Sequence, residues 1–174
     1  QAGEQAGAAR AWTLLGQAAW FRADRTTGLA CLDRAVELFD DLPDTPEKAD
    51  AYAELGRLHM LNLEDGPAVA AAGAAAEIAS QLRLVEAAAN ARITIGTSQY
   101  LAGDRRGLAE LQAVMDLCRQ QHLLALPRVA RNLSYALMEE GDWTASVAVR
   151  EEGRASAPSG HTLATGFFGG AQDA

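Results

Sequence analysis

The sequence contains almost no lysine and few aromatic or β-branched residues. Lys48 is the single lysine beside fourteen arginines, aromatic residues make up 6% of the chain, and the net charge is −8. Because the basic residues are spread singly, no stripe of positive charge is available to neutralise a run of phosphates, and we expect no direct nucleic-acid binding by this segment. The excess of alanine and leucine favours closely packed helices over sheets, so the expected fold class is all-α.

Cysteine and histidine are too sparse and too scattered for the usual metal-site patterns. Cys31 and Cys118 have no CxxC spacing, and we expect both to be buried, reduced thiols. The three histidines, His59, His122 and His161, lie in different segments without HExxH spacing. We therefore expect neither a metal ion nor another cofactor.

The patterns typical of nucleotide-binding and hydrolytic enzymes are also missing. Lys48 does not lie beside a glycine-rich turn of the phosphate-binding type, and no serine has Gly-x-Ser-x-Gly flanks. Acidic pairs such as Glu139 and Glu140 are expected to be solvated surface charge. The sequence therefore predicts a protein that is not an enzyme.

Long apolar runs are absent as well. No stretch approaches the roughly 20 residues of a membrane-spanning helix, because arginine or acidic residues interrupt each apolar segment, and the N-terminus has no signal-peptide pattern. Together with reduced thiols, this favours a cytoplasmic protein without membrane contact. The chain starts at Gln1 and not at a methionine, which suggests a fragment of a longer polypeptide.

An internal repeat organises most of the chain. An aliphatic residue followed by glycine recurs every 40 residues, and a fourth copy with serine in place of glycine follows after 38 more: Leu15-Gly16, Leu55-Gly56, Ile95-Gly96 and Leu133-Ser134. Each copy is followed eight residues later by an acidic residue: Asp24, Glu64, Asp104 and Asp142. A fixed period of this length is typical of a helical repeat array.

Capping signals and apolar spacing divide each repeat into two helices. Gly103-Asp104 and Gly141-Asp142 each combine a glycine suited to a positive φ at a helix end with a carboxylate that caps the next helix. We expect Asp65-Gly66-Pro67 to form an equivalent turn, with the proline at the first helical position, and Thr45 to cap a helix beginning at Pro46. Between these signals, apolar residues recur at three- and four-residue intervals, which indicates helices.

The expected architecture is a right-handed α-solenoid of about four helical hairpins. The predicted helices are 4–22 and 26–41, 46–62 and 67–82, 84–102 and 105–121, and 126–140 and 143–155. They pair into hairpins at about 4–41, 46–82, 84–121 and 126–155, forming one repeat domain over residues 1–155. Residues 156–174 fall outside the pattern, and their proline and glycines predict a loop-like or disordered tail.

The repeated glycine needs a structural reason, because glycine inside a helix costs roughly 1 kcal/mol relative to alanine. We expect the two helices of each hairpin to approach closely at this position. The residues twelve positions later would face it: Gly28, Ala68, Leu108 and Ser146. Leu108 fits this contact poorly because its side chain is large.

The repeat resembles the tetratricopeptide repeat, whose first helix carries the pattern Trp-x-x-Leu-Gly-x-x-Tyr. The segment from Trp12 to Leu15-Gly16 matches the opening of this pattern. The tyrosine position is occupied by Ala19, His59 and Gln99, and the repeat length of 38–40 residues exceeds the usual 34. The resemblance implies a degenerate tetratricopeptide-like fold.

Four segments are similar to helical repeats of large multidomain actinobacterial regulators: Ile95-Gly96-Thr97, Ala102 to Leu108, Arg131-Asn132-Leu133 and Glu140-Gly141-Asp142-Trp143. In those proteins the repeats follow an NTP-binding module and accompany either a LuxR-type DNA-binding domain or a nucleotide-cyclase domain. The resemblance implies a role in signal transduction or transcriptional regulation, with other domains of the same polypeptide as partners.

The first helices of a tetratricopeptide-like array line a concave groove. Counting from the shared glycine gives the candidate groove residues: Arg10, Gln17, Trp20, Arg57, Met60, Thr97, Tyr100, Arg128, Arg131, Tyr135 and Met138. Arginines interleaved with aromatic side chains would suit an acidic or amphipathic peptide. One row of this set has an alternative place in the seam between adjacent hairpins: Trp20, Met60, Tyr100 and Met138.

The expected function is protein interaction or signal sensing, with a peptide or protein ligand bound in the groove of a fragment of a larger regulator. The alternative is a stand-alone scaffold or adaptor that self-associates. Neither end of the array looks polar in the sequence, although repeat arrays need covered ends. This points to a truncated segment or to a homodimer.

Overall fold

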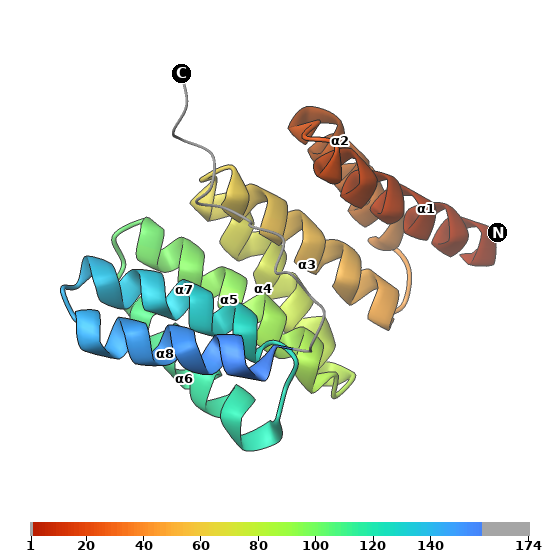
Figure 1. The fold of residues 1–174 in the computed structure, drawn as a ribbon. Helices are drawn as coiled ribbons and strands as arrows, with labels where there is room; N and C mark the ends of the chain where they lie inside the picture. The colour runs from red at the N-terminus through yellow and green to blue at the C-terminus, as the bar shows by residue number, and fades with distance from the viewer. Residues whose placement is uncertain (1, 158–174) are drawn as a thin grey trace.

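The computed structural model describes residues 2–157, which form eight α-helices joined by short connections (Figure 1). The helices are α1 (Ala2–Phe21), α2 (Arg25–Phe39), α3 (Pro46–Leu61), α4 (Asp65–Gln81), α5 (Val85–Leu101), α6 (Arg106–Gln121), α7 (Leu126–Glu139) and α8 (Trp143–Ser156). The expected all-α class and the order of the helices are confirmed. The described residues reach only the start of the expected tail over 156–174, and the rest of that segment lies outside them.

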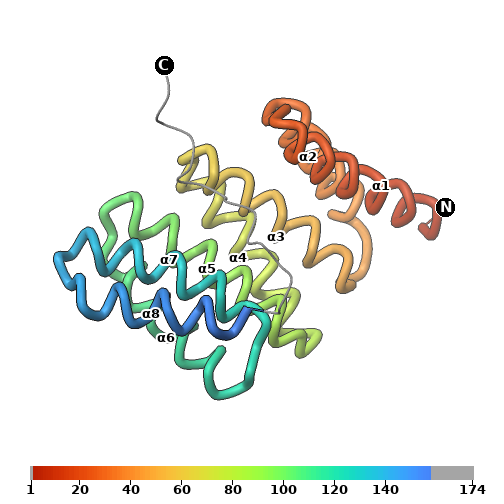
Figure 2. Tube along the Cα trace, in the orientation of Figure 1, coloured from red at the N-terminus to blue at the C-terminus, as the bar shows by residue number. Residues whose placement is uncertain are grey.

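Consecutive helices pair into hairpins, and the hairpins stack in chain order (Figure 2). The first helices of neighbouring hairpins touch one another, α1 with α3, α3 with α5 and α5 with α7. Within residues 2–157, no such contact joins α2 with α4, α4 with α6 or α6 with α8. The first helices therefore form the inner side of a curved α-solenoid, as expected from the sequence.

The turn inside each hairpin has the same backbone geometry in all four copies. A positive φ occurs at the residue before the acidic position: Ala23 (60°), Leu63 (60°), Gly103 (85°) and Gly141 (84°). The amide of the following acidic residue donates to the carbonyl five residues earlier, over 2.9–3.0 Å. This is the Schellman arrangement, which satisfies the last carbonyls of the first helix. The positive φ expected at the two glycines is confirmed.

The second helix of a hairpin starts from the acidic residue. Asp24 and Asp142 accept hydrogen bonds from the amides of Thr27 (3.1 Å) and Ala145 (3.0 Å), as N-cap residues do. The prediction for Asp65-Gly66-Pro67 is wrong in register, because Leu63 and not Gly66 takes the positive φ and α4 already begins at Asp65. The proline still lies in the first turn, where its missing N–H leaves no helical hydrogen bond unmade.

Thr45 caps α3 as predicted. Its hydroxyl accepts a hydrogen bond from the amide of Lys48 at 3.2 Å, and Pro46 follows at the start of the helix.

The repeated glycine allows the two helices of a hairpin to touch, which confirms the expected close approach. A Cβ on Gly56 would lie 3.0 Å from the carbonyl oxygen of Ala68, and a Cβ on Gly16 would lie 3.0 Å from that of Gly28. In the fourth hairpin, which has serine instead of glycine, the hydroxyl of Ser146 donates to the carbonyl of Ser134 at 2.7 Å.

The third hairpin departs from the predicted register. Gly107 and not Leu108 faces Gly96, and the two backbones are so close that no Cβ fits on Gly107. The reason is the start of α6: the amide of Gly107 donates to the carbonyl of Asp104, three residues back, whereas the other three hairpins make this bond over four residues. The tighter turn brings the contact residue one position earlier.

The apolar residues form a core that continues from hairpin to hairpin. Leu32 of α2 packs with Leu55 and Leu58 of α3, and the largest cluster joins α5, α6 and α7. Cys31 and Cys118 are 7% and 0% exposed, so the expected burial of both thiols is confirmed. No helix among the described residues is long and apolar enough to cross a membrane.

Candidate functional site

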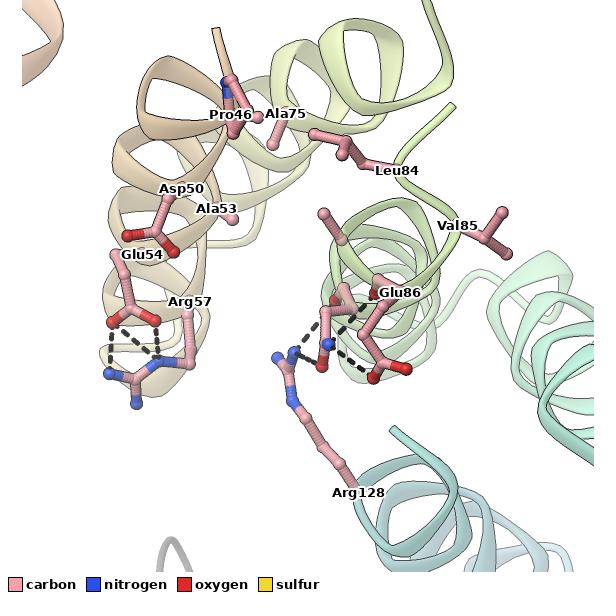
Figure 3. Close-up of a pocket in the computed structure, with 13 residues that line it drawn as sticks. Pro46, Asp50, Ala53, Glu54, Arg57, Ala75, Leu84, Val85, Glu86 and Arg128 are labelled. Carbon is pink, nitrogen blue, oxygen red and sulfur yellow. Dashed lines mark hydrogen bonds and ion pairs between the residues drawn. The ribbon is translucent and has the colours of Figure 1, made fainter. Parts of the chain in front are cut away.

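A groove of about 640 Å³ lies on the inner side of the solenoid, between α3 and α5 (Figure 3). Its apolar lining comes from α3, from α4 and from the α4–α5 connection with the start of α5: Pro46, Ala49, Ala53, Ala75, Leu84, Val85 and Ala87. Its polar lining comes from α3, α5 and α7: Asp50, Glu54, Arg57, Glu86, Asn90 and Arg128. Pro46, Ala75 and Leu84 lie toward one end, and Arg57 and Arg128 lie toward the other. The groove is therefore amphipathic along its length.

Arg57 and Glu54 form an ion pair on the groove side of α3. The guanidinium Nη2 lies 2.6 Å from the Glu54 Oε2, and Nε donates to the same oxygen at 3.1 Å. The two residues are three positions apart, which places them on the same face of the helix. Both side chains are partly buried, so the pair holds the Arg57 guanidinium in place along the groove wall.

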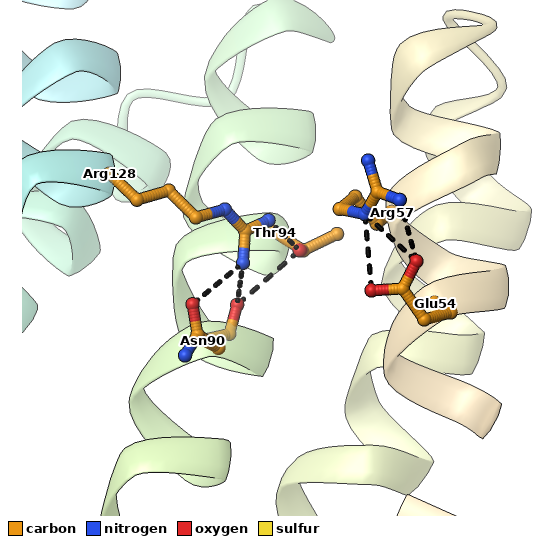
Figure 4. Close-up of polar contacts among 5 residues, drawn as sticks. All are labelled: Glu54, Arg57, Asn90, Thr94 and Arg128. Atoms are coloured by element: carbon orange, nitrogen blue, oxygen red, sulfur yellow. Dashed lines mark hydrogen bonds and ion pairs between the residues drawn. The ribbon is translucent and has the colours of Figure 1, made fainter. Parts of the chain in front are cut away.

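Arg128 reaches from the first turn of α7 to the side of α5 (Figure 4). Its Nη1 donates to the carbonyl oxygen of Asn90 at 2.9 Å and to the Asn90 Oδ1 at 3.1 Å, and its Nη2 donates to the Thr94 hydroxyl at 2.8 Å. The Asn90 amide nitrogen in turn donates to the carbonyl of Glu86 at 3.1 Å. Neutral acceptors therefore fix the position of Arg128, and within residues 2–157 its positive charge has no carboxylate partner in an ion pair.

The electrostatic environment of Arg128 is unfavourable for its charge. Removal from solvent, and then the positive charge of Arg57, lower the pKa of Arg128 to about 10. The side chain stays protonated at neutral pH, because this pKa is still far above 7. A half-buried positive charge whose hydrogen-bond partners are neutral is a good binding point for an anionic group.

Arg131 lies one turn after Arg128 on α7 and adds to this positive region. Desolvation, and then the charge of Arg57, lower the pKa of Arg131 below its ordinary value. Its side chain is exposed and has no hydrogen-bond partner within residues 2–157. Three guanidinium groups from α3 and α7 therefore repel one another across the inner side of the solenoid.

The α3 wall adds negative charge nearer the apolar end. Asp50 lies one turn before Glu54, and desolvation, followed by the charge of Glu54, raises the pKa of the Asp50 carboxyl group. The groove therefore has the Asp50 carboxyl group nearer its apolar end and Arg128, together with the Glu54–Arg57 ion pair, toward its other end. A ligand with separated charges would bind in one direction only.

The structure brings together several of the residues predicted from the repeat. Arg57 and Arg128 line the groove, and Arg131 and half-buried Tyr135 follow on α7. Thr97 lies on α5, where its hydroxyl donates to the Ile93 carbonyl at 2.7 Å and accepts from the Asn132 side chain at 2.9 Å. This hydroxyl links α5 to α7 on the inner side.

One row of candidates had an alternative place in the seam between hairpins: Trp20, Met60, Tyr100 and Met138. The structure places this row mainly in the seam. Met60 is only 6% exposed, and Trp20 packs on the cluster that joins α2 with α3. The Tyr100 hydroxyl donates to the Ala136 carbonyl of the next hairpin at 3.1 Å. Met138 is half-buried near the end of α7. None of the four lines the groove.

The other two candidates on α1, Arg10 and Gln17, also lie away from the groove. Arg10 is exposed, forms an ion pair with Glu47 at 3.4 Å, and lines a separate hollow of about 360 Å³ beside the α2–α3 connection. Gln17 is half-buried and does not line the groove.

Counting from the glycine missed some of the groove residues. Glu54 belongs to a row two residues before the glycine, which repeats as Thr94 in α5, so the same counting could have found both. Leu84 and Val85 lie twelve and eleven residues before Gly96, at the end of the α4–α5 connection and the start of α5, whereas the counted rows begin only six residues before the glycine. Within residues 2–157, no group of three or more His, Cys, Asp or Glu side chains is placed to hold a metal ion.

Comparison with known proteins bears on the fold. No family model matches the sequence, and no curated protein matches it. The structure is similar to that of RapI in its apo form, with a TM-score of 0.73 and 12% identity over 86% of this chain and 56% of that chain. It is also similar to a Rap protein complexed with Competence and Sporulation Factor, with a TM-score of 0.76 and 13% identity over 87% of this chain and 43% of that chain.

A third similar structure holds the TPR-like repeats of a putative kinesin light chain from Podospora anserina. Its TM-score is 0.65 and its identity 16%, over 83% of this chain and 72% of that chain. The chain spans about half the length of the two Rap proteins. At these identities the similarity shows the fold, and the chain is a tetratricopeptide-like helical repeat solenoid.

Proposed function

We propose that this chain is a non-catalytic protein-interaction domain that binds a peptide, or an extended segment of a partner protein, in the groove between α3 and α5. The observation that carries the proposal is the position of Arg128, whose charge is held by neutral acceptors at one end of an amphipathic groove. A half-buried cation whose hydrogen-bond partners are neutral favours an anionic ligand.

The lining defines the chemistry of the ligand. Apolar side chains would pack on Pro46, Leu84 and Val85, and a side-chain or terminal carboxylate would bind Arg128 at the other end of the groove. Arg131, one turn further along α7, would add its positive charge beside that carboxylate. Desolvation, and then repulsion among the guanidinium groups, lower the pKa values of both α7 arginines, and such an anion would relieve that repulsion. The ligand class is therefore a peptide with apolar residues on one side of an acidic group.

The similar structures support a binding role. One of them is a Rap protein in complex with Competence and Sporulation Factor, so a related fold holds a ligand. We propose that this chain likewise acts through binding in the cytoplasm, as part of a larger signalling or transcriptional regulator of the kind that its repeats resemble. A ligand that joins α3, α5 and α7 would change their packing and so signal to attached domains.

The test begins with selection from a random peptide library on the immobilised chain. We expect selected peptides to contain apolar residues and an acidic group, and we expect Arg131→Glu to weaken their binding at least about tenfold in fluorescence anisotropy, because it replaces attraction by repulsion. Arg150→Glu on α8 is the matched control, since Arg150 is also exposed but, unlike Arg131, is not among the charges that shift the pKa of Arg128.

Circular dichroism should be the same for both variants, because neither arginine side chain has a hydrogen-bond partner within residues 2–157. A library that yields no binders, or an equal loss of affinity in the two variants, would exclude the groove as the binding site.

A further inference from the structure

The apolar end of the groove is lined mainly by small side chains. Four alanines form most of this lining, beside Pro46, Leu84 and Val85: Ala49, Ala53, Ala75 and Ala87. Because alanines leave the groove wide, an occupant needs large apolar side chains to displace the water from it. Aromatic side chains bury the largest apolar area per residue. The apolar end is therefore suited to an aromatic residue of the ligand.

The chain itself contains a segment with this chemistry. Residues 158–174 follow α8 and lie outside the described residues. We call them the 158–174 segment. They include two of the four phenylalanines of the chain, Phe167-Phe168, and one acidic residue, Asp173, with no lysine or arginine. Large apolar residues beside an acidic group are the ligand class proposed for the groove, and no basic residue of the segment would be repelled by the guanidinium groups there.

The end of α8 lies beside the start of α7. A Cβ on Gly153 would lie 2.5 Å from the Cβ of Ala130 and 3.6 Å from the Cα of Pro127. Pro127 directly precedes Arg128, whose guanidinium group lies toward the polar end of the groove. The last turn of α8 is therefore packed on the turn of α7 that supplies this guanidinium group.

The groove lies along the same edge of the solenoid as the end of α8. The two helices of a hairpin run in opposite directions, so the second helices end near the edge where the first helices begin (Figure 2). Pro46 and Val85 are the first residues of α3 and α5, and both line the groove. Arg128 lies in the first turn of α7. The chain therefore leaves α8 at the edge that carries the groove.

The 158–174 segment is long enough to reach both ends of the groove. Packed helices lie about 8–10 Å apart, so the path from α7 across α5 to α3 is about 20 Å. Phe167 is ten residues beyond Ala157, and ten extended residues span up to roughly 33 Å. Asp173 follows the aromatic pair after five residues, or roughly 17 Å when extended. Along α3, the groove wall from Asp50 to Arg57 rises only about 10 Å.

We infer that the 158–174 segment binds in the groove of its own chain, with Phe167-Phe168 at the apolar end and the Asp173 carboxylate at Arg128. The inference rests on the groove binding proposed above and names one ligand for it. Gly169-Gly170 allow the chain to turn back toward Arg128, because glycine adopts turn conformations at no steric cost. A ligand on the same chain has a high effective concentration, so a peptide from a partner protein binds only by displacing it.

The first test measures competition in the whole chain. Phe167→Ser combined with Phe168→Ser should raise the affinity for library-selected peptides at least about fivefold in fluorescence anisotropy, because the competing segment no longer fills the apolar end. Val147→Ser on α8 is the control, since Val147 is 55% exposed and does not line the groove. This change should leave the affinity the same. Equal affinities for the unchanged chain and the double variant would overturn the inference, although the proposed function would stand because the peptides still bind.

A synthetic peptide of residues 158–174 gives a direct readout. It should bind the double variant at least about fivefold more tightly than the unchanged chain, whose groove already holds the same sequence. Arg131→Glu in the double variant should weaken this binding, and Arg150→Glu should not. A peptide that does not bind the double variant, or that binds equally after both arginine changes, would overturn the inference. If no library peptide binds either form, the proposed function itself fails.

Discussion

Gly56 of α3 packs so closely on Ala72 of α4 that a Cβ on the glycine would lie 2.8 Å from the Ala72 backbone nitrogen. A real Cβ cannot be accommodated at this distance unless the two helices move apart. The glycine is therefore required by the partner helix, although it weakens its own helix.

Gly56→Ala should lower the free energy of unfolding by about 1–3 kcal/mol, because overpacking outweighs the better helix propensity of alanine. Gly73→Ala is the matched control: it also lies inside a helix, but nothing lies within 4 Å of its missing Cβ. That change should raise stability by about 0.5–1 kcal/mol. Urea unfolding followed by circular dichroism measures both, and equal effects would contradict the assigned contact.

The single lysine joins the first hairpin to the second. The Lys48 ammonium donates to the carbonyl oxygens of Leu42 at 2.9 Å and Asp40 at 3.3 Å, and it forms an ion pair with Asp44 at 3.3 Å. Lys48→Met keeps the apolar stem but removes these donors, so we expect a loss of about 1–3 kcal/mol. Asp44→Asn removes only a partly exposed ion pair and should cost less than about 1 kcal/mol. Thermal unfolding of the two variants would compare them, and a larger loss for Asp44→Asn would be inconsistent with this structure.

A change of Tyr100 tests whether this residue stabilises the contact between hairpins or binds the ligand. Its hydroxyl donates to the Ala136 carbonyl, so Tyr100→Phe should lower stability by about 1 kcal/mol. Because the side chain does not line the groove, the affinity of a selected peptide should stay the same. The measurements are urea unfolding and fluorescence anisotropy on one protein preparation. If affinity fell while stability stayed the same, Tyr100 would instead have to contact the ligand.

The Cys118 thiol should be unreactive in the folded chain. Burial, and then the charge of Glu86, raise its pKa from 9.0 to about 11, and the residue is 0% exposed. At pH 8 the folded thiol is therefore protonated as well as inaccessible, and a thiol reagent should modify it only at the rate of unfolding. Mass spectrometry after labelling with and without denaturant checks this, and rapid labelling of the native chain would contradict it.

The raised pKa of Cys118 also makes the stability of the folded chain depend on pH. A folded-state pKa above the unfolded value means that the native chain binds the proton more tightly, so this contribution to stability is complete below pH 9 and is lost as the pH rises toward 11. Cys118→Ala should remove that part of the alkaline decline.

The repeat predicted the architecture because its signals are local. Each helix start and hairpin turn depends on a few neighbouring residues, such as Thr45 or Gly103, and a fixed period places equivalent residues on equivalent faces. Arg57 and Arg128 could be assigned to the inner side in this way. The position of Met60 could not, because the border between seam and groove depends on how each helix is rotated against its neighbours.

Two further features of the structure could not be predicted from the repeat period. The contact residue of the third hairpin is Gly107 because α6 begins with a three-residue hydrogen bond, and a count of twelve residues cannot reveal that turn. The apolar end of the groove includes Leu84 and Val85, which reach it from the α4–α5 connection and the start of α5. Both features lie at the connections between helices. The three- and four-residue spacing of apolar residues that predicts a helix does not extend into these connections.

Within residues 2–157, each helix contacts only helices that lie at most two positions away in the chain. Such a protein has a low contact order, which favours fast folding, and its cooperativity passes from neighbour to neighbour. Local opening should therefore begin at the ends, so amide exchange should be slowest in α4 and α5 and fastest in the outermost helices. The groove between α3 and α5 then lies in the part of the chain that unfolds last.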